Sequence, residues 1–405
     1  MGWTSMPIKY AFETTFGGIW GTDEKYDQRD RICIRVADFD YSRFKVIDNP
    51  STIRNISDLE LSSKSLRHGD ILIEKSGGGE KTLVGRAVRF TGEYQAVCSN
   101  FVSVLRPRSN QSSRFWSYVL ASLYSNRGTF PFIKQSTGIQ NLDLQAFLSQ
   151  RVNVPTLQEQ EQIADELDRE LAEIDAAIED LNNLKLLSNE KLLTEIRRLI
   201  FTHDVPMAPI KRFGTVKLGK MITSREKDDM IKAPYIRAAN IQPWGVLTYE
   251  YDTKEMFFTK DELQALNLIK DDVVVVEGGA GFGRSGVLKN NLYGWGYQNS
   301  INRIRVNKNI ADPYYIHYTL LSMLHAGEIL VATNQATIPH LTAEKLEALL
   351  IPHHSLEIQQ QIVKRITDYE EKYLQLTQDV LSHMKLLKEY KTSLISAKIM
   401  RSTND

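Results

Sequence analysis

The chain has 405 residues, 42% of them hydrophobic and 25% charged, and its formal net charge is zero. This composition is typical of a globular protein long enough for two domains with hydrophobic cores. It excludes a membrane span, because no apolar stretch reaches about 20 residues. The two cysteines, Cys33 and Cys98, exclude a disulfide framework and are expected as buried thiols. No signal peptide is visible, so we expect a cytoplasmic protein.

Residues 1–155 are predicted to form a first mixed α/β globule. The apolar strand Ile71–Glu74 follows Gly69-Asp70 and runs into the glycine-rich segment Gly77–Gly79. Gly85-Arg86 and further strand-like runs come next, and residues 115–122 read as a short helix. Glycines after a strand let a backbone approach another surface closely. This globule is mildly basic, with 20 Lys and Arg against 15 Asp and Glu.

Residues 156–204 form the next segment, in which residues 156–202 are predicted to be one long helix. The segment carries 5 Lys and Arg against 13 Asp and Glu, so most of the acidic excess of the chain lies here. The stretch lacks glycine and proline up to residue 202, and Pro155 precedes it, where proline is tolerated. Apolar residues follow the 3 and 4 spacing of a coiled-coil seam: Leu167, Leu171, Ile174, Ile178, Leu181, Leu192, Ile196 and Leu199.

Residues 205–352 are predicted to form a second globule on the same frame. The apolar strand at residues 273–276 leads into Gly278 to Gly283-Arg284-Ser285, which differs from a phosphate-binding loop in having Arg for Lys. No helix is expected to follow this loop, so nucleotide binding is disfavoured. Asp312-Pro313 is interpreted as the start of a helix, with Asp312 as N-cap, and not as part of a methyltransferase motif.

Residues 353–405 complete the chain with a second long helix, predicted over residues 356–399. Each helix has about 44 residues and is therefore about 65 Å long at 1.5 Å per residue. Packing of each helix on its own globule is the alternative to a coiled coil, but such a helix outruns an ordinary domain. His353-His354 has no third ligand nearby and is expected at the surface. The expected seam is Ile366, Tyr369, Tyr373, Leu376, Val380, His383, Leu387, Tyr390, Leu394 and Ala397.

The two halves of the chain repeat each other at a step of 199 residues. Leu157-x-x-Gln160-x-x-Ile163 recurs as Leu356-x-x-Gln359-x-x-Ile362, and Leu142 recurs as Leu341 within Ile338-Pro339-His340-Leu341. An internal duplication of this length predicts two equivalent domains, each followed by an equivalent helix. Between the shared segments the two globules differ in sequence, so the copies have diverged in their variable parts.

Arginines near the glycine-rich loops are the candidate DNA contacts, because arginine can bind guanine bidentately and can also bind phosphate. Arg35 and Arg237 occupy matching places, and a structural ion pair with Asp38 is an equal alternative for Arg35. We find no catalytic constellation and no metal site in the sequence. The complete candidate set is Arg35, Gly78, Arg86, Arg89, Arg106, Arg237, Gly281, Arg284, Arg303 and Arg305.

These features resemble the DNA-specificity subunit of type I restriction-modification systems. The resemblance rests on the Ile-Pro-x-Leu block at Ile338, the doubled Leu-x-x-Gln-x-x-Ile helix start, the frame Ile-Arg-x-x-Asp/Asn and the strand before the glycine-rich loop. It implies an α+β protein in which two target recognition domains, 1–155 and 205–352, are joined by antiparallel spacer helices with pseudo-two-fold symmetry. Gln140, where the second copy has Pro339, departs from the pattern.

The resemblance further implies a non-catalytic subunit that reads double-stranded DNA as two half-sites. Two methyltransferase subunits would bind S-adenosylmethionine and methylate adenine at its exocyclic amine, and ATP-driven restriction subunits would join them. This chain itself would hold no cofactor and would not contact a membrane. A specificity subunit of a smaller methyltransferase-nuclease system, or a protein-binding scaffold, remain the alternatives.

Overall fold

The computed structural model describes residues 3–78, 82–136, 138–223, 229–251, 253–333 and 339–400. The chain divides into two compact units, each made of one globule and the adjoining parts of both long helices. Unit 1 comprises residues 1–181 and 382–405, and unit 2 comprises residues 182–381. Ile338 and Gly79, which belong to motifs of the sequence analysis, lie outside the described residues.

Unit 1 is built on a mixed sheet of six strands in the order β2-β11-β7-β9-β5-β4. The central strand β7 is buried along its whole length; its apolar run Ile71–Ile73 predicts this burial, whereas the buried Glu74 at its end does not follow from the pattern. Its six strands are β2 (Phe12–Gly17), β4 (Phe39–Asp40), β5 (Lys45–Val46), β7 (Ile71–Glu74), β9 (Ala87–Arg89) and β11 (Val102–Pro107). Smaller sheets are formed by β1 (Thr4–Pro7) with β14 (Arg151–Val154), by β3 (Asp30–Ile34), β6 (Ile53–Asn55) and β10 (Ala96–Cys98), and by β8 (Ser76–Gly77), β12 (Ile133–Ser136) and β13 (Ile139–Leu142).

Unit 2 repeats this plan with fewer strands. Its main sheet has the order β16-β22-β19-β20, and in both units a second, three-stranded sheet contains one parallel pair. The strands are β15 (Met207–Pro209), β16 (Gly214–Leu218), β17 (Ile231–Ile236), β18 (Lys254–Phe258), β19 (Val273–Val276), β20 (Ser285–Val287), β21 (Gly296–Tyr297), β22 (Ile301–Val306) and β23 (Leu350–Pro352). Equivalent strands of the two units therefore confirm the predicted duplication.

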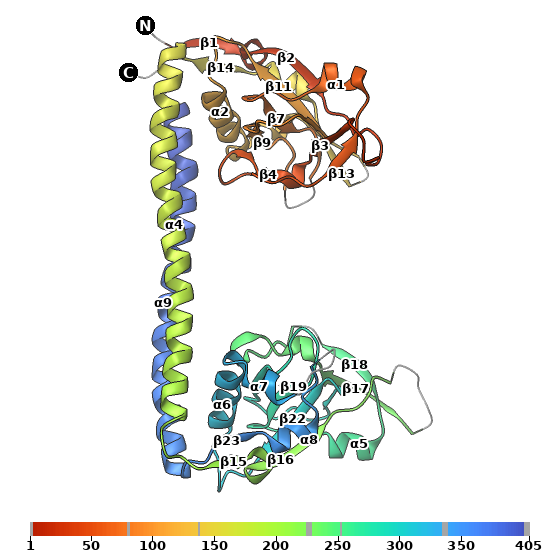
Figure 1. Ribbon diagram of the computed structural model, residues 1–405, viewed down its shortest axis with the longest axis vertical. Helices are drawn as coiled ribbons and strands as arrows, with labels where there is room; N and C mark the ends of the chain where they lie inside the picture. Colours follow the sequence, from red (N-terminus) through yellow and green to blue (C-terminus); the bar gives the residue numbers. More distant parts are fainter. Residues whose placement is uncertain are drawn as a thin grey trace. The chain divides into compact units, whose positions relative to one another are not determined.

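One helix of 13 residues in each unit lies between the main sheet and the paired long helices (Figure 1). These helices are α2 (Ser113–Ser125) and α6 (Pro313–His325), and Asp312 caps α6 as predicted by accepting from Tyr314 N at 2.8 Å. The remaining short helices are α1 (Asp58–Lys64), α3 (Leu144–Leu148), α5 (Lys260–Ala265), α7 (Glu328–Ala332) and α8 (Ala343–Ala348). Cys33 and Cys98 are buried thiols, as expected.

The long helices α4 (Leu157–Ile200) and α9 (Leu356–Ile399) contact each other in both units and are antiparallel. Within unit 1, Lys391 bonds Asp175 at 2.6 Å and Lys398 bonds Glu166 at 2.7 Å, so residue numbers rise along one helix as they fall along the other. The predicted seam of α4 is confirmed for the residues that are less than a tenth exposed, namely Leu167, Leu171, Ile174, Leu192, Ile196 and Leu199.

The seam predicted for α9 is correct up to Tyr373 and wrong at several later positions. Leu376 and Tyr390 are exposed, at 36% and 57%, and His383 and Ala397 are exposed as well. Val380, Leu387 and Leu394 face inward as predicted, but Lys391, only 8% exposed, is buried in place of Tyr390. The prediction did not consider a lysine for the seam, whereas Lys391 is buried with its charge paired to Asp175.

Two buried glutamines explain the repeated helix-start motif. Gln160 accepts from Ser112 N at 2.9 Å and donates to Pro155 O, and Gln359 likewise accepts from Asp312 N and donates to His354 O. Each glutamine therefore ties the first turn of a long helix to the N-cap residue of α2 or α6. His354 is 8% exposed and bonds Ile200 O at 2.8 Å, so the expectation of a surface histidine pair is wrong for this residue.

Candidate nucleic-acid interface

A buried aspartate before the central strand holds one of the candidate arginines in each unit. Asp70 and Asp272 are each 1% exposed. Arg106 donates to both oxygens of Asp70 at 2.8 and 2.7 Å, and Arg305 donates to both oxygens of Asp272 at 2.9 and 2.7 Å. These hydrogen bonds raise the pKa of both arginines. A bidentate pair with a buried carboxylate occupies the guanidinium and favours a structural role for Arg106 and Arg305.

Arg303 and Arg89 are also directed into their own units. Arg303 is 5% exposed and donates to Asn267 O at 2.6 Å. Burial lowers the pKa of Arg303, and it lowers the pKa of Arg89 in β9, whose charged neighbours include Asp168 of α4. Their positions favour packing within the globule over contact with DNA.

Arg86 lies between two tyrosine rings in unit 1. Its guanidinium carbon is 4.4 Å from the centre of the Tyr41 ring and 5.3 Å from that of Tyr124. Its Nε donates to the Tyr124 hydroxyl at 3.0 Å. Cation–π contacts and a hydrogen bond together restrain this side chain.

Arg35 and Arg237 precede equivalent 3-10 turns, η2 (Val36–Asp38) and η5 (Ala238–Asn240). Asp38 accepts from Arg35 N at 2.7 Å and lies 3.7 Å from its Nε, so the structural pairing considered for Arg35 is present. The Arg35 side chain nevertheless remains 43% exposed. Arg237 N donates to Asn240 Oδ1 at 3.0 Å in the same geometry.

Arg284 lies at the end of a glycine-rich turn in unit 2. Arg284 N donates to Gly281 O at 3.0 Å, and Val276 N donates to Arg284 O at 2.8 Å. The strand β20 follows directly, so the turn is not at a helix N-terminus, as predicted. The side chain is half-buried, and it forms no ion pair with the described residues. It is therefore better placed than Arg303 or Arg305 to contact a partner.

A pocket of about 490 Å³ in unit 1 brings together two of the candidates, Arg35 and Gly78. It also contains Glu74, the last residue of β7, which the sequence analysis did not select. Glu74 is 6% exposed, and burial raises its pKa to about 7 although the nearby Arg86 lowers it. A charged residue that ends an apolar strand beside glycines was the signal available in the sequence. The other lining residues are Trp20, Val36, Ala37, Ser76, Gly77, Ser99, Asn100 and Phe101.

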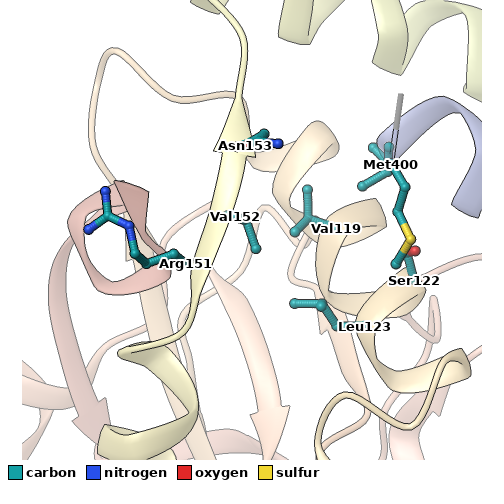
Figure 2. Close-up of a pocket in the computed structure, with 8 residues that line it drawn as sticks. Val119, Ser122, Leu123, Arg151, Val152, Asn153 and Met400 are labelled. Atoms are coloured by element: carbon teal, nitrogen blue, oxygen red, sulfur yellow. The ribbon is translucent and has the colours of Figure 1, made fainter. Parts of the chain in front are cut away.

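A second pocket of unit 1, of about 280 Å³, lies between α2, β14 and the end of α9. Figure 2 shows Val119 and Val152 facing its interior, whereas the Arg151 side chain leads away. Arg151 Nη2 donates to Ser5 O at 2.7 Å. This pocket is mainly apolar and does not resemble a nucleic-acid site.

The described residues also bear on metal binding and on membrane crossing. No group of three or more His, Cys, Asp or Glu side chains in this part of the chain is arranged to hold a metal ion. None of the helices there combines the length and the hydropathy that a membrane crossing requires.

Comparisons with known proteins agree with this architecture. Residues 39–185 and 204–385 each match the model of the type I restriction modification DNA specificity domain. A comparison with curated protein sequences found no match.

Two solved structures are similar in fold across nearly the whole chain. One belongs to a study of complex assembly and conformational transition of the type I R-M system (13% identity, TM-score 0.64, covering 98% of this chain and 97% of that one). The other is the HsdS subunit from Thermoanaerobacter tengcongensis (12% identity, TM-score 0.53, covering 98% and 96%). With two matched domains that span most of its residues, this chain belongs to the type I restriction-modification DNA specificity family.

Proposed function

We propose that this protein is the DNA-reading, non-catalytic subunit of a type I restriction-modification complex in the cytoplasm. Each globule binds one half of a bipartite, asymmetric DNA sequence. One observation carries the proposal: the two units share the same strands and buried polar pairs but have different loops. The pairs Asp70–Arg106 and Asp272–Arg305 and the two buried glutamines recur in both units. The loops around Glu74 and around Arg284 do not match, which favours two different half-sites over one site present twice.

The long helices act as a spacer and as the docking surface for two methyltransferase subunits. Those subunits supply S-adenosylmethionine and the chemistry of adenine methylation, and restriction subunits join the same core. The family membership and the neighbouring type I R-M structure support these partners. No step of the chemistry is assigned to this chain.

Selection from randomised DNA tests the reading function. The protein, co-purified with the methyltransferase subunit of its own system, is incubated with a duplex library at a fixed salt concentration, because phosphate contacts make affinity depend on salt. We expect enrichment of two short sequences separated by a constant gap. Binding without any sequence preference, with and without the methyltransferase, would refute the proposal. Methylome sequencing of cells that carry the system provides an independent reading of the same target.

A paired deletion tests the spacer. The register fixed by Asn189–Tyr373 and Asp175–Lys391 places residues 182–188 opposite residues 375–381. Removing both segments shortens the helices by about two turns, or about 10 Å, without shifting the seam. We expect the gap to change by about three base pairs at 3.4 Å each while both half-sites stay the same. Altered half-sites with an unchanged gap would contradict a spacer role.

A further inference from the structure

The pocket around Glu74 combines hydrogen-bonding groups of opposite character with aromatic walls. Glu74 offers carboxylate oxygens, which only accept when ionised, and Arg35 offers a guanidinium, which only donates. Trp20 and Phe101 border the pocket and are 37% and 48% exposed. Flat apolar rings next to a few placed polar groups are typical of a site that binds a specific organic ligand.

Glu74 is deeply buried, and its contacts within the protein give no structural reason for this burial. The exposed fraction of Glu74 is 6%, and its carboxylate forms no ion pair with the described residues. The backbone N–H of Gly78 donates to its carboxylate, and the cationic Arg86 nearby is hydrogen-bonded to Tyr124 instead. Burying a carboxylate without an ion pair is costly, so a residue of this kind that lines a pocket is a candidate for ligand contact.

Gly77 leaves space beside this carboxylate, and Gly78 permits the turn from which its N–H reaches the carboxylate. A Cβ at Gly77 would lie 3.1 Å from Glu74 Oε1, tighter than an ordinary contact, and one at Gly78 would lie 2.8 Å from Thr82 O. Gly78 has a φ of +65°, which L side chains rarely adopt. The glycine-rich segment therefore leaves room beside Glu74 that any larger residue would fill.

Unit 2 has no counterpart of this carboxylate. Glu74 N donates to Arg86 O and Val276 N donates to Arg284 O, each at 2.8 Å, so Val276 occupies the place of Glu74. Glu277 of unit 2 instead matches Lys75, because Leu142 N donates to Lys75 O and Leu341 N donates to Glu277 O. The glutamates that follow the two apolar runs are therefore not equivalent.

We propose that Glu74 is a specificity-determining residue that accepts a hydrogen bond from the exocyclic amine of cytosine in the half-site bound by unit 1. This inference rests on the proposed function and extends it to one base pair. Cytosine N4 is the major-groove amine that suits a carboxylate, because adenine N6 lies beside the N7 acceptor, to which a carboxylate cannot donate. Guanine of the same pair offers O6 and N7 to Arg35. Thymine presents only an acceptor and a methyl group there, and it is rejected because a carboxylate cannot donate to it.

Glu74→Gln distinguishes base reading from support of the glycine turn. The amide oxygen of glutamine can still accept from Gly78 N–H, so the turn is retained. In the duplex selection, we expect one C·G position of the unit 1 half-site to lose about ten-fold in preference or to change toward adenine, which glutamine reads bidentately. The half-site of unit 2, identified as the one weakened by Arg284→Ala, stays the same, and Glu277→Gln leaves the unit 1 half-site unchanged.

A change in the DNA makes the test independent of how well the variant folds. A duplex in which 2-pyrimidinone replaces that cytosine lacks only the exocyclic amine. The wild-type complex should bind it about ten-fold more weakly, while Glu74→Gln should lose little further affinity. Equal binding of the two duplexes by the wild-type complex, unchanged preferences in Glu74→Gln, or a unit 1 half-site without a C·G pair would each overturn the inference. A wild-type complex without any two-part preference would instead overturn the proposed function.

Discussion

The two units attach their globules to the long helices in different ways. In unit 1 an ionic cluster adds to the apolar contacts: Arg114 of α2 contacts Glu161, Asp165 and Asp168 of α4. Lys398 of α9 contacts Glu166 and Glu170 of α4 and so joins the two long helices to each other. Lysines and an arginine of this unit therefore neutralise much of the acidic excess of residues 156–204.

In unit 2 aromatic rings have a larger part in this attachment, beside the ion pair of Arg197 in α4 with Glu328 in α7. Trp244, at a φ of +64°, stacks on His325 with ring centres 5.8 Å apart and lies equally close to Tyr373 of α9. Tyr318 of α6 donates to Glu370 at 2.6 Å. A single frame therefore tolerates two kinds of helix contact, because the sheet and the buried aspartate–arginine pair fix its shape independently of them.

Loss of an aspartate–arginine pair of the shared frame should reduce the unfolding free energy most, and the reduction should be equal in the two units. Arg106→Ala leaves Asp70 buried without its partner, and Arg305→Ala does the same to Asp272. We expect each variant to lose about 3–5 kcal/mol of unfolding free energy in its own unit only. Hydrogen exchange resolved by segment, comparing β7 with β19, measures this. Loss of protection in both units from either variant would show that the two do not unfold independently.

The next effect is larger in unit 1 than in unit 2 and depends on pH. The folded-state pKa of Glu74 is about 7, above the usual 4.5, so between these values the folded state binds more protons than the unfolded state. Stability therefore falls as pH rises from about 4.5 to 7 and then levels off. Glu74→Gln removes this penalty and should gain about 1–3 kcal/mol on wild type at pH 8 but little at pH 5.

Glu277→Gln is the matched control in unit 2 for this pH effect. Burial also raises the pKa of Glu277, but Glu277 is more exposed than Glu74. Its substitution should therefore show the same sign with a smaller amplitude. Denaturant titrations at the two pH values provide both measurements, and a gain for Glu74→Gln that is independent of pH would exclude ionisation as the cause.

Because the loops of the two units differ, a change in one loop should weaken recognition of one half-site only. Arg284→Ala is expected to weaken discrimination by about 1–3 kcal/mol in the half-site of unit 2 while the other half-site keeps its affinity. Competition binding with DNA altered in one half at a time measures this. An equal loss at both halves would contradict the assignment of one globule to one half-site.

The ion pairs between the long helices of unit 1 and the ring stack of unit 2 should differ least in size but clearly in salt dependence. Lys398→Ala should cost about 0.5–1 kcal/mol at low ionic strength and almost nothing near 1 M salt, because its ion pairs are screened. His325→Ala should cost about 0.5–1.5 kcal/mol at either salt concentration, since ring stacking carries no net charge. Thermal unfolding of both variants in two buffers tests this, and parallel salt responses would contradict the distinction.

The candidate arginines show where sequence reasoning was insufficient. They were selected for their residue type and their position near glycine-rich loops, yet Arg106, Arg303 and Arg305 make hydrogen bonds to Asp70, Asn267 and Asp272 within the globules. A guanidinium serves a buried carboxylate as well as it serves a phosphate, so residue type alone does not separate the two roles. Glu74 was overlooked for the converse reason, because a carboxylate is not an expected contact for a polyanion.

The sequence by itself determined the duplication, the two long helices with most of their first seam, and the equivalent strands. These follow from periodic patterns of apolar residues and from a repeated motif, both of which are local. Only the tertiary structure decided which predicted positions of α9 after Tyr373 are exposed, the burial of Lys391 and His354, and the gathering of Glu74, Arg35 and Gly78 around one pocket. Those features depend on residues that are distant in the chain and that neutralise a buried charge or accept its hydrogen bonds. A local sequence pattern does not specify which distant residue will take that place in the folded protein.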